Sequence, residues 1–516
     1  MAMNNLSHRH ALVAPGGADL IHWLSTDAGV RDRVLADGRH TVSYEETIPL
    51  LEELDALFTR CRASHRHPLA LECSQTVAGA IALLFVLSRE YDVVLLPELG
   101  ESSKELGTPR FIPSFCSHVL TASAGKAGSV DSPIQGIELV VNDAFAAEPV
   151  LADFVGPDLY LRTSGSTGKP KLTRMSHRKW LNNAAACGER WKLTADDRLS
   201  VPVPIFHSYG FGAAFLPGLL AGAAMDVGSG GNILRYLERE SRFEPNVAFL
   251  TPGLCSMFLS VRKTPRSYRL AVTAGDKIKR ETMAEFESRF GPLLNLYGSA
   301  EMGAVSSASP DDPPGVRLGT AGYPLAGIEL DVAEAGEEIE TALGERVGRL
   351  QCRQKNGSNG YLIQEERWCF EPRGNDEWFD TGDVAKIRAD GYVEIVGRSG
   401  LSAKRDGLLV VFAEVEAAVE RVEGIQRAVV VSMGESRRGS RLVAVCLVDP
   451  GRGEGIAPGT VRRRCFECLP HYAVPDEVVT VESLPLLPSG KIDRCAIREL
   501  VLTGRQATAV QQLGKP

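Results

Sequence analysis

Residues 163–171 read Thr163-Ser164-Gly165-Ser166-Thr167-Gly168-Lys169-Pro170-Lys171 and follow the apolar, strand-like run Leu159-Tyr160-Leu161. The two glycines allow the backbone to curl closely around an anion, while the hydroxyls and lysines supply hydrogen-bond donors and positive charge. A featureless loop of serine and glycine is the alternative, but so dense a group of hydroxyls, glycines and lysines behind a strand disfavours it. The stretch therefore predicts a loop that holds phosphate.

Two common motifs are absent from the sequence. A Walker A loop has a glycine five residues before its Gly-Lys pair, and that position holds Thr163. No G-x-S-x-G occurs in the chain, so the nucleophile elbow of an α/β-hydrolase has no support. An ordinary P-loop NTPase and a serine hydrolase are both disfavoured.

The length and pattern of the chain predict more than one domain. Its 516 residues exceed the roughly 250–300 that one hydrophobic core usually supports. Up to about residue 395, apolar runs such as 93–96 and 247–250 alternate with helical stretches such as 232–242, which favours α/β layers with buried strands. After residues 397–400 a compact α+β pattern follows. We expect a large N-terminal domain over residues 1–397 and a small C-terminal domain over 398–516.

Charge and cysteine content exclude several kinds of partner and location. The net charge of −8 provides no global positive field for nucleic acid. The eleven cysteines are scattered and odd in number, and the only C-x-x-C, Cys465 to Cys468, has no further ligands nearby. The longest apolar run, 77–87, is about half of the ~20 residues that a membrane span needs and is expected to be a buried helix. We expect a cytoplasmic protein with no membrane span and no nucleic-acid partner.

The loop Ser164 to Lys171 resembles the signature loop of the adenylate-forming (ANL) superfamily, which includes acyl- and aryl-CoA synthetases. Other blocks of that superfamily follow in its order, namely Tyr297-Gly298-Ser299-Ala300-Glu301, Phe379-Asp380-Thr381-Gly382-Asp383, Gly397-Arg398 and Pro488-Ser489-Gly490-Lys491. The resemblance implies an α/β fold: a large N-terminal AMP-binding domain with layered sheets, and a small mobile α+β lid that carries the catalytic lysine.

The resemblance also implies the reaction. An ATP-dependent acid–thiol ligase first joins a carboxylate to the α-phosphate of ATP and releases pyrophosphate, with Mg²⁺ as cofactor. It then passes the acyl group to CoA. A ligase that loads the phosphopantetheine arm of a holo acyl carrier protein is the nearest alternative. A non-catalytic nucleotide-binding homologue is a third.

Residue roles carry over position by position. Catalytic roles fall to Lys491, which would bridge the substrate carboxylate and the α-phosphate, to Glu301, which would hold Mg²⁺, and to His207. Tyr297 would flank adenine, and Asp383 would bind the ribose diol. The full set of implied ATP and AMP contacts is Thr163, Ser164, Gly165, Ser166, Thr167, Gly168, Lys171, Ala274, Gly275, Asp276, Tyr297, Gly298, Ser299, Asp383 and Arg398.

The substrate acid would lie beside His207, Gly275 and Gly298. Adenylation domains that take α-amino acids carry an aspartate directly after the phenylalanine of the block Pro204-Ile205-Phe206, and His207 occupies that position here. An acid without an α-ammonium group is therefore favoured. A purely structural role for His207 stays open.

Two segments concern the second half-reaction, and two positions depart from the superfamily. Lys404 and Gly407 resemble the segment that approaches the site when the thiol attacks, and Gly400 lies at the expected hinge. Gly400 replaces the usual aspartate or lysine, yet glycine permits the backbone change that a hinge needs. Ala300 replaces a threonine that would donate to the α-phosphate, at a cost of about 1–3 kcal/mol unless Ser299 or water substitutes.

Overall fold

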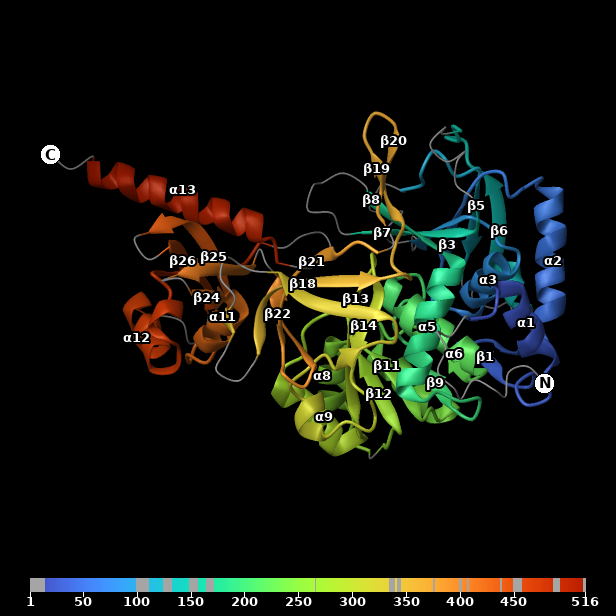
Figure 1. Ribbon diagram of the computed structural model, residues 1–516, viewed down its shortest axis with the longest axis horizontal. Helices are drawn as coiled ribbons and strands as arrows, with labels where there is room; N and C mark the ends of the chain where they lie inside the picture. Colours follow the sequence, from blue (N-terminus) through green and yellow to red (C-terminus); the bar gives the residue numbers. More distant parts are fainter. Residues whose placement is uncertain are drawn as a thin grey trace. The chain divides into compact units, whose positions relative to one another are not determined.

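The computed structural model describes residues 14–98, 111–123, 132–147, 156–163, 171–264, 266–333, 339–340, 345–374, 376–398, 401–405, 408–436, 439–448, 457–485 and 492–513 (Figure 1). The chain forms two compact units. The large unit comprises Met1–Asp331, Gln351–Phe379 and Arg388–Glu394, and the small unit comprises Val332–Leu350, Asp380–Ile387 and Ile395–Pro516. The units interleave in sequence, and the expected domain boundary between residues 397 and 398 stays a prediction.

The first sheet of the large unit has eight strands in the order β20-β19-β8-β7-β4-β3-β5-β6. Its parallel centre is formed by apolar strands, which is the pattern expected of strands covered on both faces. The strands are β3 (Leu69–Cys73), β4 (Val93–Pro97), β5 (His118–Ala122), β6 (Ile137–Val141), β7 (Asp158–Arg162), β8 (Lys171–Ser176), β19 (Gly360–Gln364) and β20 (Trp368–Pro372).

The second sheet has nine strands in the order β15-β14-β13-β12-β11-β9-β10-β1-β2, and the run from β1 to β13 is parallel. Its strands are β1 (Val34–Ala36), β2 (Thr41–Ser43), β9 (Arg198–Ser200), β10 (Ala224–Asp226), β11 (Val247–Leu250), β12 (Leu270–Thr273), β13 (Leu293–Ser299), β14 (Gly303–Ser307) and β15 (Tyr323–Pro324). The expected strands 93–96 and 247–250 coincide with β4 and β11.

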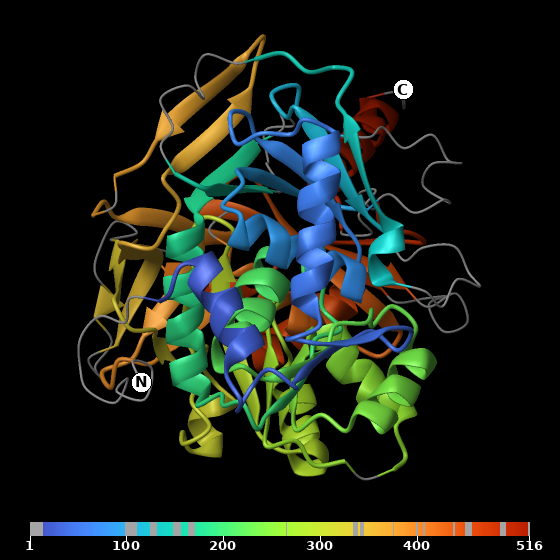
Figure 2. The same ribbon diagram turned by 90° about the vertical axis from the view of Figure 1, so that its right-hand side faces the viewer.

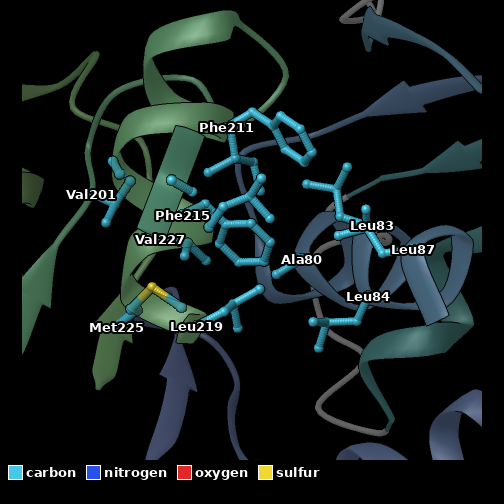
Figure 3. Packing of buried hydrophobic residues seen from close by; sticks show 14 of the residues in the cluster. Ala80, Leu83, Leu84, Leu87, Val201, Phe211, Phe215, Leu219, Met225 and Val227 are labelled. Atoms are coloured by element: carbon cyan, nitrogen blue, oxygen red, sulfur yellow. The ribbon is translucent and has the colours of Figure 1, made fainter. Parts of the chain in front are cut away.

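The apolar run 77–87 is confirmed as a buried helix. It forms α3 (Val77–Ser88), whose twelve residues are all buried. Thr76 caps its start by accepting a hydrogen bond from the Gly79 amide. Figure 3 shows Leu83, Leu84 and Leu87 facing aromatic and aliphatic side chains of the second sheet's helical layer. This helix therefore joins the cores beneath the two sheets.

The other helices of the large unit cover the sheets. Helices α1 (Gly17–Thr26) and α2 (Thr47–Arg60) pack against α3 and lie toward the viewer in Figure 2. The expected helix 232–242 is α7 (Ile233–Phe243). The remaining helical segments are η1 (Pro133–Gly136), α5 (His177–Trp191), the π-helix η3 (Tyr209–Phe215), α6 (Leu216–Ala221), α8 (Pro252–Val261), α9 (Arg280–Phe290) and α10 (Pro314–Arg317).

A third sheet has the order β16-β18-β21-β22, with β17 paired to β18. Its strands are β16 (Ile328–Ala333), β17 (Ile339–Glu340), β18 (Arg346–Gln354), β21 (Phe379–Ile387) and β22 (Val393–Arg398). Residues of these strands are divided between the two units.

The C-terminal part of the small unit is an α+β sandwich around the order β24-β23-β26-β25, with β27 parallel to β26. Its elements are β23 (Ser402–Arg405), β24 (Leu408–Val411), α11 (Phe412–Glu420), β25 (Ile425–Ser436), β26 (Gly439–Val448), α12 (Pro458–Cys468), η5 (His471–Ala473), β27 (Glu477–Val481) and α13 (Arg494–Leu513). The fully buried guanidinium of Arg405 donates to the Val474 carbonyl and to Asp476, each at 2.7 Å.

The predicted fold class is confirmed: α/β layers in a large N-terminal part, and a small α+β C-terminal part. Within the described stretches, no helix combines the length and apolar character needed to cross a membrane.

Candidate functional site

The two described ends of the predicted phosphate loop are held together by a strand pair. Strands β7 and β8 are antiparallel, with Arg162 opposite Leu172. The Thr163 amide donates to the Lys171 carbonyl at 3.0 Å, which extends the pairing by one step. The predicted contacts Ser164, Gly165, Ser166, Thr167 and Gly168 lie outside the described residues.

Lys171 and Glu301 are connected through one aromatic ring. The ammonium of Lys171 lies 3.5 Å from the ring centroid of Tyr361, within the range of a cation–π contact. The Tyr361 hydroxyl donates to Oε1 of Glu301 at 3.3 Å. The structure thus brings together a cation of the predicted phosphate loop and the carboxylate predicted to hold metal.

Glu301 stands at the tip of the β13–β14 hairpin, between Ser299 and Gly303, which face each other in the ladder. The turn is tight, because a Cβ on Gly298 would lie 2.3 Å from the Gly303 carbonyl oxygen. Gly303 has φ +64° and therefore adopts the left-handed region that glycine tolerates. The carbonyl of Glu301 accepts from the Ser358 amide at 2.7 Å, which anchors the turn from the β18–β19 connection.

Ser299 lies beside the departure at Ala300. Its Oγ accepts from the Met302 amide at 3.2 Å, so the hydroxyl hydrogen remains for another acceptor. Tyr297, on the same hairpin, is half-buried against a small cluster built on Met302, Val305 and Cys352. The expected roles of Ser299 in replacing threonine and of Tyr297 beside adenine stay predictions.

The predicted Ala274–Asp276 loop follows the carboxyl end of β12. Parallel α/β sheets bind ligands at this end of their strands. Gly275 has φ +93° and open space where a Cβ would stand, and Asp276 is exposed, with its Oδ1 accepting from the Lys277 amide at 2.7 Å. Ala274 is buried. The backbone at Gly275 is therefore approachable.

The segment with His207 is tied to the same edge by Tyr209, at the start of η3. The Tyr209 hydroxyl lies 2.9 Å from the carbonyl of Val272, the penultimate residue of β12, and 3.2 Å from the carbonyl of Leu250, the last residue of β11. A π-helix such as η3 often marks a functional position. The His207 side chain is exposed, and its ring lies 4.9 Å from that of Phe206.

Gln75 holds the strand end that precedes His207. Its Nε2 donates to the Val201 and Val203 carbonyls at 2.8 Å each, and its Oε1 accepts from the Ile205 amide at 2.7 Å. This amide pins the chain from residue 201 to 205 onto the end of the first sheet. The backbone that carries His207 is thus fixed although its side chain is exposed.

Two partly buried cations, Lys179 and Arg373, lie near the Glu301 turn. Burial lowers the pKa of Lys179 to about 8, and its ammonium donates to Gly357 O and Asn359 Oδ1. Burial also lowers the pKa of Arg373, which contacts the sulfur of Met302 at 3.2 Å. Burial and the neighbouring Glu301 carboxylate raise the pKa of Tyr361, so its hydroxyl stays protonated and able to donate.

The protein ligands available at Glu301 fit a metal ion that is bound mainly by phosphate oxygens. No set of three or more histidine, cysteine, aspartate or glutamate side chains gathers at one point in the part of the chain that the structure describes. Mg²⁺ usually takes one or two carboxylates together with substrate phosphates. A single carboxylate, connected through Tyr361 to the end of the predicted phosphate loop, therefore fits Mg²⁺ delivered with a nucleotide.

The other predicted site residues belong to β21, β22 and the C-terminal part. Asp383 is buried on β21, directly after Gly382 at φ +71°, and its amide donates to Thr381 Oγ1 at 3.1 Å. Arg398 ends β22 and Lys404 lies in β23. Gly400, Gly407 and Lys491 lie outside the described residues.

The sequence analysis predicted no role for three residues whose hydrogen bonds position the site: Tyr361, Tyr209 and Gln75. Tyr361 is an ordinary aromatic within a strand pattern, and Gln75 is a lone amide before an apolar helix. Only Tyr209 stands close to a predicted site residue in the sequence, two residues after His207. Each acts through partners distant in the chain, which no local pattern reveals.

Comparison with known proteins identifies the same family over two parts of the chain. Residues 159–362 match the family of AMP-binding enzymes, and residues 414–491 match the AMP-binding enzyme C-terminal domain. Together these matches span most of the predicted blocks.

Similar proteins include ligases of several acids. A "3-[(3aS,4S,7aS)-7a-methyl-1,5-dioxo-octahydro-1H-inden-4-yl]propanoyl:CoA ligase" of Rhodococcus jostii is 29% identical over 70% of this chain and 69% of its own length. The mitochondrial medium-chain acyl-CoA ligase ACSF2 of Mus musculus is 29% identical over 72% of this chain, but only 63% of its own length is covered. The crystal structure of ATP-bound MatB from Rhodopseudomonas palustris shares the fold, with TM-score 0.72 and 19% identity over 94% of this chain and 99% of that one.

Proposed function

Because the chain belongs to the family of AMP-binding, adenylate-forming enzymes, we propose that it is an AMP-forming acid–thiol ligase. In the first step a carboxylate oxygen attacks the α-phosphorus of ATP, the bond to pyrophosphate breaks, and acyl-AMP forms. In the second step the thiolate of CoA attacks the acyl carbon, and AMP leaves with the bonding electron pair. ATP, Mg²⁺ and CoA are thus the implied cofactors and co-substrate, and the named relatives act on different acids.

One observation carries the proposal: Lys171 and Glu301 both contact Tyr361. Lys171 packs on the face of the ring and Glu301 accepts from the hydroxyl, and Lys171 ends a stretch whose composition is typical of phosphate binding. Bringing two anions together requires positive charge and oriented donors, and these must already be in place when charge develops on the leaving group. Mg²⁺ held by Glu301 would supply charge to balance the departing pyrophosphate. Lys171 would add a cation, and the strand pair at Thr163 keeps it close to the loop.

The carboxyl end of the second sheet would receive the acid. The open backbone at Gly275 and the fixed segment before His207 lie at this edge, and Gly298 lies on β13, the strand that pairs with β12. Histidine at position 207 offers no carboxylate for an α-ammonium group, so we propose an acid that lacks one. On the small unit, Asp383 would bind the ribose, and Lys491 would bridge the carboxylate and the α-phosphate.

The state of the cysteines supports a proposal about location. All eleven cysteines lie within described stretches, and each is a free thiol. Free thiols persist in a reducing compartment. We therefore place the protein in the cytoplasm.

Pyrophosphate exchange into ATP, measured over a panel of aliphatic and aromatic acids without α-amino groups, tests the first step. Exchange with at least one acid supports the ligase, and exchange with none would leave only a nucleotide-binding protein. Thioester formation with free CoA, compared with a holo acyl carrier protein, then identifies the acceptor. Preference for the carrier protein would replace CoA in the proposal.

A further inference from the structure

Tyr361 contacts two side chains of opposite charge, Lys171 and Glu301. Lys171 lies over the face of its ring, at 3.5 Å from the centroid, and Glu301 accepts from its hydroxyl at 3.3 Å. Within the described ranges, neither Lys171 nor Glu301 forms an ion pair. Tyr361 therefore gives the lysine a cation–π contact and the carboxylate a hydrogen bond, while the two charges form no ion pair with each other.

The position of this ring is set by the sheet. Tyr361 belongs to β19, which is paired on both sides: it stands opposite Thr173 of β8 and Glu371 of β20. Gly360, just before it, has φ +138°, and a Cβ there would lie 2.1 Å from the Glu371 carbonyl oxygen. The backbone under the ring therefore has little freedom to shift.

A direct Lys171–Glu301 pair would be unfavourable for metal binding. An ammonium on the carboxylate would neutralise it and occupy its lone pairs, which a divalent cation needs. A hydroxyl donor on one oxygen leaves the second oxygen and the full negative charge. The hydroxyl also fixes the orientation of the carboxylate, as partners of metal ligands commonly do.

We propose that Tyr361 is a positioning residue: it orients Glu301 for a divalent cation that arrives with the nucleotide and keeps Lys171 from pairing with that carboxylate. This inference rests on the proposed function for the identity of the nucleotide, but it concerns metal binding and not acyl transfer. It also separates the two tasks in the site. Lys171 stays available to the phosphate loop, and Glu301 stays available to the metal.

The test uses Mn²⁺ as probe with α,β-methylene-ATP, which cannot react at the α-phosphate. Electron paramagnetic resonance of free Mn²⁺ measures its uptake by the full-length protein with the nucleotide. Tyr361→Phe removes only the hydroxyl and should weaken Mn²⁺ uptake by about 3- to 10-fold, the usual effect of one lost hydrogen bond. Tyr361→Leu also removes the ring and should weaken it further, because Lys171 can then reach Glu301.

Tyr392→Phe is the matched control. Its hydroxyl also donates to a carboxylate of the large unit, Asp312 Oδ1 at 2.7 Å, away from the Glu301 turn. This variant should lose a comparable hydrogen bond without any change in Mn²⁺ uptake. Thermal unfolding of all variants checks that they are folded.

The outcomes are separable. If Tyr361→Phe takes up Mn²⁺ like the parent, Tyr361 does not orient Glu301, and the inference is wrong. If Tyr361→Leu matches Tyr361→Phe, the ring does not hold Lys171 away. Absence of pyrophosphate exchange in the parent, with Mn²⁺ uptake intact and sensitive to Tyr361→Phe, would refute the ligase and keep the metal site.

Discussion

The side-chain amide of Asn183 hydrogen-bonds both backbone groups of Ala304: Oδ1 accepts from the amide at 2.9 Å, and Nδ2 donates to the carbonyl at 2.8 Å. Asn183 is buried on α5, and Ala304 follows the Glu301 turn on β14. One helix side chain thereby takes the place of a strand partner where the hairpin ladder is irregular. Helix α5 therefore helps to position the turn that carries Glu301, through the hydrogen bonds of Asn183 to Ala304.

Asn183→Ala should therefore destabilise the fold and loosen the site together. Two buried backbone groups would lose their partners, at a cost of about 2–4 kcal/mol in the free energy of unfolding. The KM for ATP should rise because the turn is less well fixed. Urea denaturation and initial rates check both effects.

The neighbouring Asn182 offers a control for this prediction. It lies on the same helix, is only half-buried, and accepts from the Ala14 amide at 2.9 Å. Asn182→Ala should change the free energy of unfolding by less than half as much. Equal losses in the two variants would show that α5 itself, and not the bond to Ala304, is responsible.

Asp92 predicts a pH dependence of stability. Burial raises the pKa of its carboxyl from the ordinary 3.8 to about 7. It accepts from the Asp158 amide at 2.7 Å, and Asp158 itself is paired with Arg174 at 2.7 Å. Between pH 4 and 7 the folded protein holds this proton more tightly than the unfolded chain, so stability attributable to Asp92 falls as pH rises through that window.

Asp92→Asn should remove this loss because an amide cannot ionise and its Oδ1 can still accept from Asp158. We expect the free energy of unfolding to increase by about 1–2 kcal/mol at pH 8 relative to the parent, and to change little at pH 5. Urea denaturation at both pH values measures the difference. The same substitution at the exposed Asp32 is the control for exchanging a carboxylate for an amide. A pH-independent effect at Asp92 would mean that its carboxyl does not take up a proton in this window.

Much of the fold was predictable from the sequence for a clear physical reason. Strands such as β4 and β11 are covered on both faces and therefore form continuous apolar runs, and α3 is apolar all round because it lies in the core between sheets. The predicted phosphate loop and the block with Glu301 could be identified from the sequence because the functional residues of each are adjacent in the chain.

The supports of the site were not predictable in the same way. Tyr361 and Glu301 are 60 positions apart, and Asn183 and Ala304 are 121 apart. Contacts of this kind depend on which elements become neighbours, here strand β8 with strand β19 and helix α5 with strand β14, and not on any local pattern. The burial of Asp92 likewise depends on the pairing of β4 with β7, so its raised pKa could not be predicted from its neighbours in sequence.

Lys491→Ala should separate the two half-reactions. If this lysine bridges the carboxylate and the α-phosphate, its loss should slow acyl-AMP formation by about 100-fold or more, the scale for removing a preorganised charged group. Thioester formation from supplied acyl-AMP should survive. Pyrophosphate exchange measures the first step, and a thioester assay with synthetic acyl-AMP measures the second. Equal loss of both steps would exclude a role confined to adenylation.

Gly400→Pro addresses the hinge. Glycine has the greatest backbone freedom of all residues, and proline fixes φ near −65°. If the small C-terminal part turns between the two chemical steps, the substitution should spare pyrophosphate exchange and slow thioester formation by about tenfold or more, because only the second step requires the turn. Gly459→Pro is the control, because this glycine lies in the first turn of α12 in the same part, where proline is tolerated and an added Cβ meets no atom within 4 Å. Circular dichroism checks the fold of both variants. Thioester formation at the parental rate in Gly400→Pro would place the hinge elsewhere, and the boundary expected at residue 398 would then be wrong.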